Sequence, residues 1–403
     1  MRVGGLSGVD SDLVVLERPI VRLGGGCSRC QRRFGEHGLS KEAWMPNRSP
    51  AKALLRPTAT LLLGSVVLAA CGQKTPQTTL NPASESTRAI YNLSELLFWL
   101  GVVVFLIVQT WLIVSIIKYR QKDSSQIPTQ IHGNTKVEIA WTIVPAIIAI
   151  VIFVFTFDTI RKIEFMPDEA AGNTLNVKVI GHQWWWEFQY PDIKDASGKP
   201  LVTANELWIP SGSYIDVKMT SVDVIHDFWI PGLAGKRDVM PNRESGLWFK
   251  ADDVADGSPA VFWGQCAEYC GGQHAYMKMR VVVASPADFQ KWSSEQSQVA
   301  VNTTLPESFT KNCIGCHVVR GTNAAGITGP DLTHFGGRMT IAAGTTDNTR
   351  EHLYAWLDDP DAVKRGNIMT TAIKADTLTE AEITELVDYL ESLNPGTSVK
   401  GQQ

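Results

Sequence analysis

Two long apolar runs stand out in the first half of the chain. They cover residues 96–117 (LLFWLGVVVFLIVQTWLIVSII) and residues 137–157 (VEIAWTIVPAIIAIVIFVFTF). Each has about 20 residues, the length that an α-helix needs to cross the hydrocarbon core of a bilayer. Neither contains a histidine that could ligate a haem within the membrane. The pattern predicts a transmembrane two-helix hairpin over residues 91–161, preceded by a polar linker over residues 72–90.

The loop between the two runs is basic. It carries a single aspartate against four basic residues, Lys118, Arg120, Lys122 and Lys136. Lysine and arginine collect in cytoplasmic loops, so we expect this loop in the cytoplasm. Everything after residue 160 is therefore expected on the outer side of the membrane.

Residues 174–286 follow a different pattern. Short segments rich in β-branched and aromatic residues, such as TLNVKVIGHQWWWEFQY and NELWIPSGSYIDVKMTS, are broken by Gly, Pro, Asp and Asn. Strands of this length and spacing indicate an all-β sandwich or barrel. The pattern therefore predicts a separate β domain after the membrane hairpin.

A polar stretch over residues 287–304 predicts a flexible linker. Residues 305–396 then return to helical spacing, which indicates a C-terminal all-α domain. In its last predicted helix, Thr379 and Glu382 are placed to form a capping box. One face of that helix carries four apolar residues, Ile383, Leu386, Val387 and Leu390.

A secretory signal is predicted deep in the chain, over residues 45–71. The stretch KALLRPTATLLLGSVVLAAC combines a basic start, a short apolar run and small residues before Cys71. Its end, LAAC, resembles the lipobox of bacterial lipoproteins, so we expect lipidation of Cys71; the alternative is a plain signal peptide. Translation is expected to start at Met45. Residues 1–44 are then an untranslated or disordered leader, in which Cys27 and Cys30 match only half of a zinc knuckle.

Composition narrows the class of protein. The chain is 44% hydrophobic and 19% charged, which suits a protein that lies partly in a membrane. Its formal net charge is only -4, and no basic run interleaved with aromatics points to nucleic acid. The later cysteines fall in close pairs that cannot staple distant parts of a core, so they indicate site chemistry.

The segment FWGQCAEYCGGQHAYMKM, residues 262–279, concentrates metal-binding side chains: Cys266, Cys270, His274 and Met277. A disulfide and a zinc site are alternatives, but thiolate, imidazole and a weak thioether are a ligand set for copper. The second thiolate has a use if both thiolates bridge two copper ions. Gly271 and Gly272 would let the loop bend around the metals. The site needs a further histidine, for which His226 is the candidate; a histidine bonded inside the sandwich is the alternative.

Five ordered motifs resemble subunit II of the haem-copper cytochrome c oxidases: VEIAWTIVPAI, GHQWWW, DVIHDFWIP, DVMPNR and CAEYCGGQHAYM. The resemblance covers residues 90–284. It implies a cupredoxin fold, a Greek-key sandwich, that carries the binuclear CuA copper centre. The implied ligands are His226, Cys266, the backbone carbonyl of Glu268, Cys270, His274 and Met277. The related quinol oxidase subunits lack these copper ligands.

The same resemblance implies roles for two further side chains. The Glu268 carboxylate would help to hold a magnesium ion at the interface with subunit I, which suits a hard cation; a solvated acid is the alternative. Trp184 corresponds to the aromatic residue through which electrons enter. Trp185 and Trp186 are weaker candidates, because an aromatic stripe in a strand usually packs. His182 is interpreted as structural.

The motif CIGCH, Cys313 to His317, predicts covalent attachment of a c-type haem. Cys313 and Cys316 would form the thioethers and His317 would ligate the iron; a redox CxxC pair is the alternative. The segment LYAWLDDPDAVKRGNIMTTA resembles the distal part of small class I cytochromes c, which makes Met369 the second axial ligand in preference to Met339. Two other histidines, His334 and His352, are interpreted as surface or packing residues.

Together these features resemble an oxidase subunit II with a cytochrome c fused at its C-terminus. The resemblance implies electron flow from an external cytochrome or blue-copper protein to haem c, then to CuA, then to the oxygen-reducing subunit I. Subunit III and membrane lipid are further expected partners, and a bacterial inner membrane is the expected location. The alternatives are an electron-transfer subunit of a nitrogen-oxide reductase and a freestanding membrane electron carrier.

Overall fold

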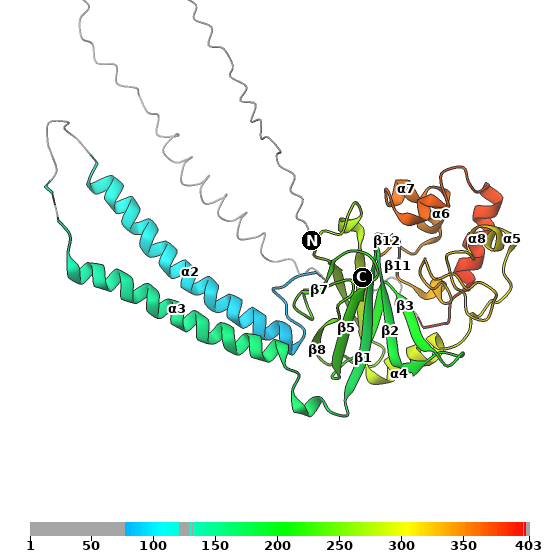
Figure 1. Ribbon diagram of the computed structural model, residues 1–403, viewed down its shortest axis with the longest axis horizontal. Coiled ribbons are helices and arrows are strands. Elements are labelled where there is room, and N and C mark those ends of the chain that lie inside the picture. The colour runs from blue at the N-terminus through cyan, green and yellow to red at the C-terminus, as the bar shows by residue number, and fades with distance from the viewer. Residues whose placement is uncertain (1–76, 121–128, 131, 398, 400–403) are drawn as a thin grey trace, which may run out of the picture. The chain divides into compact units, whose positions relative to one another are not determined.

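The computed structural model describes residues 77–120, 129–130, 132–397 and 399. The predicted leader, the signal segment and Cys71 lie outside the described residues, as does the half zinc knuckle of Cys27 and Cys30. In Figure 1 the described elements are coloured from blue through green to red along the chain.

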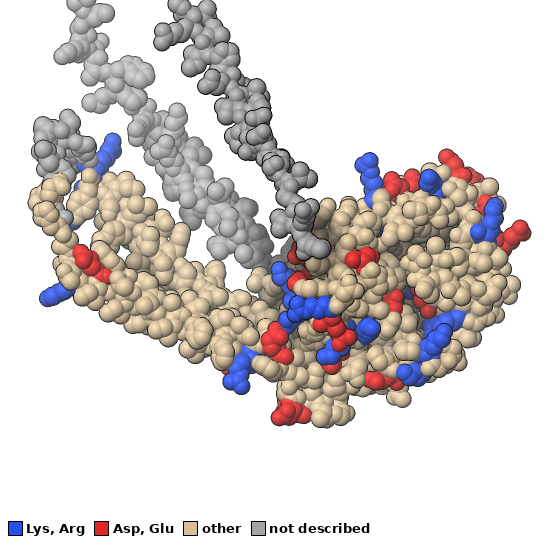
Figure 2. Space-filling view, in the orientation of Figure 1, with Lys and Arg blue, Asp and Glu red and all other residues tan. Residues whose placement is uncertain are grey.

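Two long helices, α2 (Glu85–Lys118) and α3 (Thr135–Glu164), form the first part of the described chain. Both are long and apolar enough to cross a membrane, by length and composition. Their apolar side chains are largely exposed, and the hairpin surface in Figure 2 is nearly free of charge along its length. An exposed apolar surface of this kind is stable in lipid rather than in water.

The first helix starts at Glu85, within the segment predicted as a linker, because a residue buried against the β domain caps its N-terminus. Ser84 is fully buried and caps the helix by accepting from the backbone N–H of Thr87. Its hydroxyl also donates to the carbonyl of Leu233 at 2.6 Å. The cap satisfies one of the free N–H groups of the first turn and joins the helix to the β domain.

The β domain is a sandwich of two five-stranded sheets, ordered β3-β2-β1-β5-β8 and β4-β10-β9-β6-β7. Each sheet contains one parallel pair, β1 with β5 and β10 with β4, among antiparallel neighbours. The strands are β1 (Thr174–His182), β2 (Trp185–Lys194), β3 (Pro200–Ala204), β4 (Glu206–Pro210), β5 (Tyr214–Ser221), β6 (His226–Trp229), β7 (Arg237–Val239), β8 (Ser245–Lys250), β9 (Ala260–Cys266) and β10 (Lys278–Ala284).

Burial along the strands explains the sandwich. In β1, β2 and β5, buried positions alternate with less buried ones, as expected for strands with one face in the core. Strands β4 and β10 are buried at nearly every position. The second face of β4 is covered by α4 (Pro286–Gln296), whose Trp292 stacks on Trp208 with ring centroids 5.2 Å apart.

That helix changes the interpretation of the segment 287–304, which was expected to be a flexible linker. Phe289 and Trp292 are buried against the sandwich, one turn apart on α4. Burial of two large aromatic side chains stabilises the helix by about 1.5–3 kcal/mol each, which outweighs the polar composition of the remaining positions. The connection between the two domains is therefore mostly ordered structure.

The C-terminal domain is small and helical. Helix α8 has the predicted capping box of Thr379 and Glu382, and the predicted apolar face is buried. The helical elements are α5 (Glu307–Asn312), η3 (Phe335–Gly337), α6 (Arg350–Asp358), α7 (Pro360–Val363), η4 (Ile368–Thr371) and α8 (Glu380–Ser392). Short 3-10 turns η1 (Asp168–Ala170) and η2 (His274–Tyr276) lie earlier in the chain, and β11 (Thr340–Ile341) pairs with β12 (Thr346–Asp347).

The predicted architecture is observed: two apolar helices, a β sandwich and a helical C-terminal domain follow one another along the chain. Each of the two globular domains has its own buried hydrophobic cluster.

Candidate functional site

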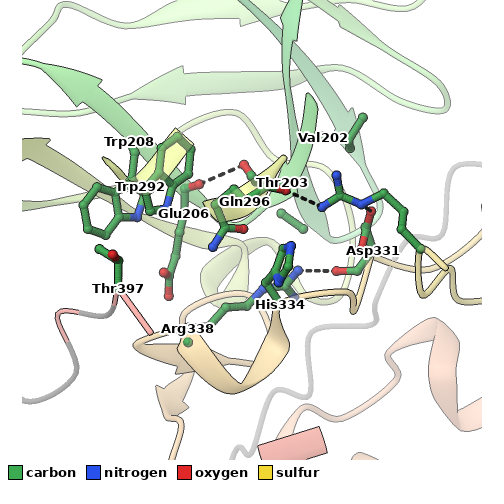
Figure 3. A pocket seen from close by; sticks show the side chains of 13 residues that line it. Val202, Thr203, Glu206, Trp208, Trp292, Gln296, Asp331, His334, Arg338 and Thr397 are labelled. Atoms are coloured by element: carbon green, nitrogen blue, oxygen red, sulfur yellow. Dashed lines mark hydrogen bonds and ion pairs between the residues drawn. The ribbon is translucent and has the colours of Figure 1, made fainter. Parts of the chain in front are cut away.

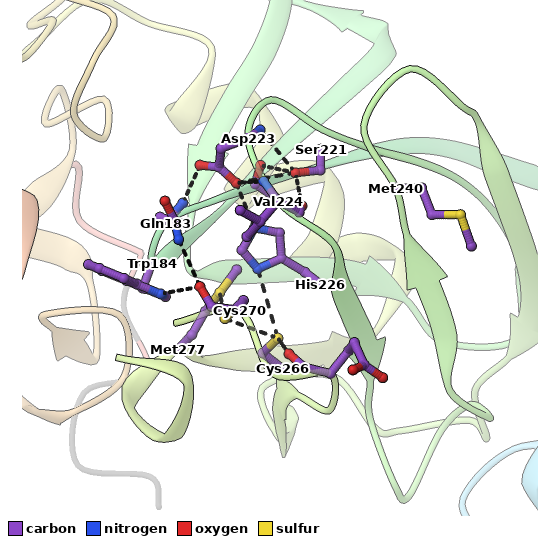
Figure 4. Close-up of polar contacts among 12 residues, drawn as sticks. Gln183, Trp184, Ser221, Asp223, Val224, His226, Met240, Cys266, Cys270 and Met277 are labelled. Carbon is purple, nitrogen blue, oxygen red and sulfur yellow. Dashed lines mark hydrogen bonds and ion pairs between the residues drawn. The ribbon is translucent and has the colours of Figure 1, made fainter. Parts of the chain in front are cut away.

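Strand pairing brings together the copper-ligand candidates of two distant segments. His226 begins β6, and Cys266 ends β9. The two strands are antiparallel neighbours with Phe228 opposite Cys266, so the imidazole and the thiol meet at one end of the sheet. The loop after β9 then turns back and supplies the remaining groups; Figure 4 shows His226, Cys266, Cys270 and Met277 close together.

The donor atoms lie close enough to share metal. The two thiol sulfurs, Cys266 Sγ and Cys270 Sγ, are 3.7 Å apart. Around them lie His226 Nδ1 at 3.9 Å from Cys266 Sγ, the carbonyl oxygen of Glu268 at 3.2 Å from Cys266 Sγ, His274 Nδ1 at 3.7 Å from Cys270 Sγ, and Met277 Sδ at 3.9 Å from Cys270 Sγ.

These distances exclude a disulfide, because a bonded pair of sulfurs lies about 2.05 Å apart.

The positions of the donor atoms also argue against a single tetrahedral zinc ion. The donor atoms of His226, Cys266 and Cys270 all lie within 4.8 Å of one another, whereas His274 falls outside that group although it lies beside Cys270. The two histidines therefore flank the thiol pair from different sides. That layout suits two metals that share the thiolates better than one tetrahedral ion.

Asp223 orients the first histidine. His226 Nε2 donates to Asp223 Oδ1 at 2.9 Å, which leaves Nδ1 free to face Cys266. Burial lowers the pKa of His226, but its hydrogen bonds with Asp223 and Cys266 outweigh burial and raise that pKa overall. A carboxylate behind a ligating imidazole fixes its tautomer and its orientation.

The two thiols are hydrogen-bonded to each other. That bond lowers the pKa of the Cys266 thiol to about 3, although burial opposes the shift. The same bond, together with burial, raises the pKa of Cys270. The lowered pKa favours the thiolate of Cys266, the form that binds metal.

Trp184 is hydrogen-bonded to the loop after β9, residues 267–277, which is called the copper loop because it carries proposed copper ligands. Its indole Nε1 donates to the carbonyl of Cys270 at 2.9 Å, and Gln183 Nε2 donates to the same oxygen at 2.8 Å. The two following tryptophans have other contacts: Trp185 stacks on His182, and Trp186 is fully buried beside His226 and Phe228. His182 also bonds Glu187, at 3.2 Å.

The Glu268 side chain faces away from the thiols. The residue is exposed although its carbonyl faces Cys266. Its carboxylate is thus available to a cation or partner outside the chain.

The haem-attachment segment follows α5 directly. His317 Nδ1 donates to the carbonyl of Pro330 at 2.8 Å, so Nε2 remains free for iron. Burial lowers the pKa of His317, which favours the neutral ring that ligates metal, and burial raises the pKa of the Cys313 thiol to about 12. A Cβ on Gly329 would lie 2.5 Å from the ring of His317, so only glycine fits there.

The two methionine candidates lie in different places. Met369, in η4, is partly buried at the edge of the C-terminal cluster, which Cys313 also borders. Met339 is 2% exposed and belongs to the hydrophobic cluster of the β domain. Of the other histidines, His352 is exposed and bonds the carbonyl of Asp347, whereas His334 is buried.

A cavity of about 30 Å³ lies where the two globular domains meet. In Figure 3 the stacked Trp208 and Trp292 lie on one side of it, and Asp331 and His334 lie on the other. Burial lowers the pKa of His334 to about 4. A cavity of this volume has room for a water molecule or two.

Sequence reasoning missed three polar residues that surround these sites. Asp223 lies within three residues of His226, a spacing that could have drawn attention to it. Glu206 and Lys364 are buried at the domain junction and have no sequence signal, because each bonds to backbone groups far away in the chain.

The chain is similar to known proteins over most of its length. Family models match in chain order: the transmembrane domain of cytochrome c oxidase subunit II at residues 75–159, its periplasmic domain at 175–285, and cytochrome c at 306–394. Cytochrome c oxidase subunit 2 of Alkalihalophilus pseudofirmus is 33% identical over 339 residues, which cover 82% of this chain and 94% of that protein. The chain belongs to the cytochrome c oxidase subunit II family.

A second member of that family, from Bacillus subtilis, is 32% identical over 351 residues, covering 83% of this chain and 96% of its own. Among solved structures, the periplasmic domain of subunit II of the Bradyrhizobium japonicum cytochrome oxidase is 34% identical, covers 30% of this chain and 91% of that one, and has a TM-score of 0.25. This protein is an oxidase subunit II with a C-terminal cytochrome c domain, and it is a membrane protein.

Proposed function

We propose that this chain carries electrons from an external donor, through haem c and a binuclear copper centre, to the oxygen-reducing subunit I of a respiratory oxidase that pumps protons. The observation that carries the proposal is the donor set of the β domain. Two free thiols lie 3.7 Å apart, and an imidazole Nδ1 flanks each of them. Copper held there would take up and release single electrons.

The proposed copper ligands are held in place by the protein itself. Asp223 fixes the ring of His226, and the bonds to the Cys270 carbonyl fix one end of the copper loop. Ligands that cannot relax keep the rearrangement on each electron transfer small. The proposed set is His226, Cys266, the Glu268 carbonyl, Cys270, His274 and Met277.

The proposed haem ligands are Cys313 and Cys316 for covalent attachment, with His317 and Met369 as axial ligands. Two observations favour Met369: it borders the same hydrophobic cluster as Cys313, whereas Met339 packs into the other domain. The bond from His317 to Pro330 leaves the correct nitrogen for iron. Haem c bound there would exchange single electrons with a donor such as a cytochrome or a blue-copper protein.

Trp184 is the proposed point of electron entry to copper, since its indole bonds the loop between the two cysteines. The exposed Glu268 carboxylate is proposed to share a magnesium ion with subunit I. The proposed location is a bacterial inner membrane, with α2 and α3 packed against subunit I and lipid, both globular domains on the outer side, and subunit III in the same complex.

Oxygen consumption tests the proposal. The complex is purified from native membranes through a C-terminal tag and supplied with an artificial reductant, for the parent chain and for His226→Ala. We expect the parent to consume oxygen, and the variant to keep haem c but lose rapid turnover. Purified parent complex that contains copper and haem but never consumes oxygen would contradict the oxidase function.

A further inference from the structure

One lysine connects the haem domain to the copper domain beside the copper loop. Lys364 follows α7 and is 4% exposed. Its Nζ donates to the carbonyl of Trp184 at 2.8 Å and to the carbonyl of Ala342 at 3.3 Å. Lysine is almost never buried to this degree without a partner. Both of its partners here are backbone oxygens, and one of them belongs to the other domain.

On the copper side, the hydrogen bond from Lys364 is connected through one residue to Cys270, a proposed copper ligand. The residue whose carbonyl accepts from Lys364 is Trp184, and its indole Nε1 donates to the carbonyl of Cys270. A single tryptophan therefore connects Lys364 to the loop that holds the thiols proposed to bind copper; Figure 4 shows the bond from Trp184 to Cys270.

On the haem side, the same lysine is tied to the segment that carries Met369. Asn367 Nδ2 donates to the carbonyl of Lys364 at 2.7 Å and to that of Pro360 at 2.9 Å. The Asn367 side chain also accepts from the backbone N–H of Thr370 and so caps η4, the turn that contains Met369. Hydrogen bonds of one side chain, Asn367, thus connect Lys364 to that turn.

A second buried charge makes the reciprocal contact. Glu206, in the β domain, accepts from the backbone N–H groups of Met339 at 2.6 Å and Thr340 at 3.2 Å in the haem domain. The backbone N–H of Lys278 donates to the carbonyl of Ala343, 3.0 Å away. Each domain therefore supplies one buried ionisable side chain that bonds to the other domain's backbone. Hydrogen bonds are directional, so these bonds fix how one domain is aligned on the other. A flat apolar contact would not fix that alignment.

We infer that Lys364 is a positioning residue that docks the haem c domain on the copper domain at Trp184 and so fixes the distance for electron transfer from haem c to copper. The inference rests on the proposed function. The step moves one electron, oxidises ferrous haem c, reduces the copper centre by one electron and needs no further reactant. Because electron transfer slows steeply with distance, undocking slows it without changing either cofactor.

The experiment compares Lys364→Met with the parent in the purified complex. Haem c is photoreduced by a fast flash, and the rate of electron appearance at copper is followed by absorbance. Hydrogen exchange of the segment 360–373 is measured on the same samples, which reports docking without any turnover. Lys374→Met is the matched control, because Lys374 is an exposed lysine of the same domain. Lys364→Arg tests whether a donor restored at that position rescues the transfer.

We expect Lys364→Met to slow the transfer about ten- to hundredfold, the scale set by leaving buried carbonyl groups without their donor, and to raise exchange in 360–373. Both absorbance spectra should stay as in the parent, Lys374→Met should behave as the parent, and Lys364→Arg should recover part of the rate. Unchanged transfer in Lys364→Met overturns the inference while leaving the proposed function intact.

Two other outcomes would also overturn the inference. If Lys364→Met and Lys364→Gln both lose the haem or copper absorbance, the lysine serves folding and the docking role is wrong. If the parent itself transfers no electron from haem c to copper, the proposed function fails and the inference fails with it.

Discussion

In the copper domain, four of the proposed ligands are at most 3% exposed, and three of these, Cys266, Cys270 and Met277, belong to the main hydrophobic cluster. In the haem domain, Cys313 and Met369 are partly exposed at the edge of a smaller cluster. The copper ligands are also cross-linked by hydrogen bonds, through Asp223 on one side and Trp184 on the other.

The difference teaches how each site depends on its cofactor. Three of the proposed copper ligands belong to the core of the sandwich, which is built mainly from other side chains. In the haem domain, Cys313 and Met369 border a smaller core, to which a haem held by them would add apolar surface. Removal of each cofactor should therefore have very different consequences.

The largest effect is expected from Cys316→Ser combined with His317→Ala. Without covalent haem the C-terminal domain should lose its packed core and become sensitive to protease, while the copper absorbance remains. Limited proteolysis and absorbance check both halves of this expectation. His352→Ala, at an exposed histidine of α6, is the control that should keep haem. A haem-free domain that resists protease as well as the parent would contradict the comparison.

Next in size is the effect of Cys270→Ser on copper. Because the second thiolate is the proposed bridge, this variant should fall from two copper ions per chain to one or none, while its β domain stays folded. Metal analysis and circular dichroism measure the two properties. Met240→Leu is the control, since Met240 stands apart from the cluster in Figure 4. Two copper ions retained in Cys270→Ser would rule out the bridging role.

A smaller effect is expected from Asp223→Ala, which removes the acceptor for His226 Nε2. Outer partners of this kind are typically worth about 10–100-fold in metal affinity. Copper competition with a chelator measures the affinity, and Asp253→Ala, at an exposed aspartate, serves as the control. An unchanged affinity would mean that the sandwich alone orients the imidazole.

The smallest effect concerns pH. Burial lowers the pKa of Lys364 from its ordinary 10.5 to about 7 in the docked structure. Between these two values the undocked lysine binds more protons than the docked one, so docking should strengthen as pH rises from about 7 to about 10. Hydrogen exchange of the segment 360–373 across this range tests the sign. Lys364→Met should remove the dependence, and weaker docking at high pH would contradict it.

Much of this architecture follows from local patterns. The two apolar runs, the alternating strands and the face of α8 each repeat at the period of one element, so their sequence reveals them. The copper loop was also predictable as a metal site, because Cys266, Cys270, His274 and Met277 fall within twelve residues of one another. Their assignment as ligands stays a prediction.

The domain junction could not be predicted in this way. Lys364, in DAVKRGN, looks like any surface lysine, and its burial results from contact with Trp184, far away in the chain. The segment with Trp292 is predicted as a flexible linker because polar residues dominate it. The structure shows that Trp292 packs on Trp208 of β4, a contact that the local pattern does not reveal. Long-range contacts of this kind leave no periodic signal in the sequence.

In the proposed path, electrons pass from haem c to copper before they reach the oxygen-reducing partner. To test this order, haem c is photoreduced in the purified parent complex, and the haem c and copper absorbances are followed together. We expect haem c to be reoxidised and copper to be reduced with the same rate constant, after which copper is reoxidised. Reoxidation of haem c while the copper stays oxidised throughout would contradict this order.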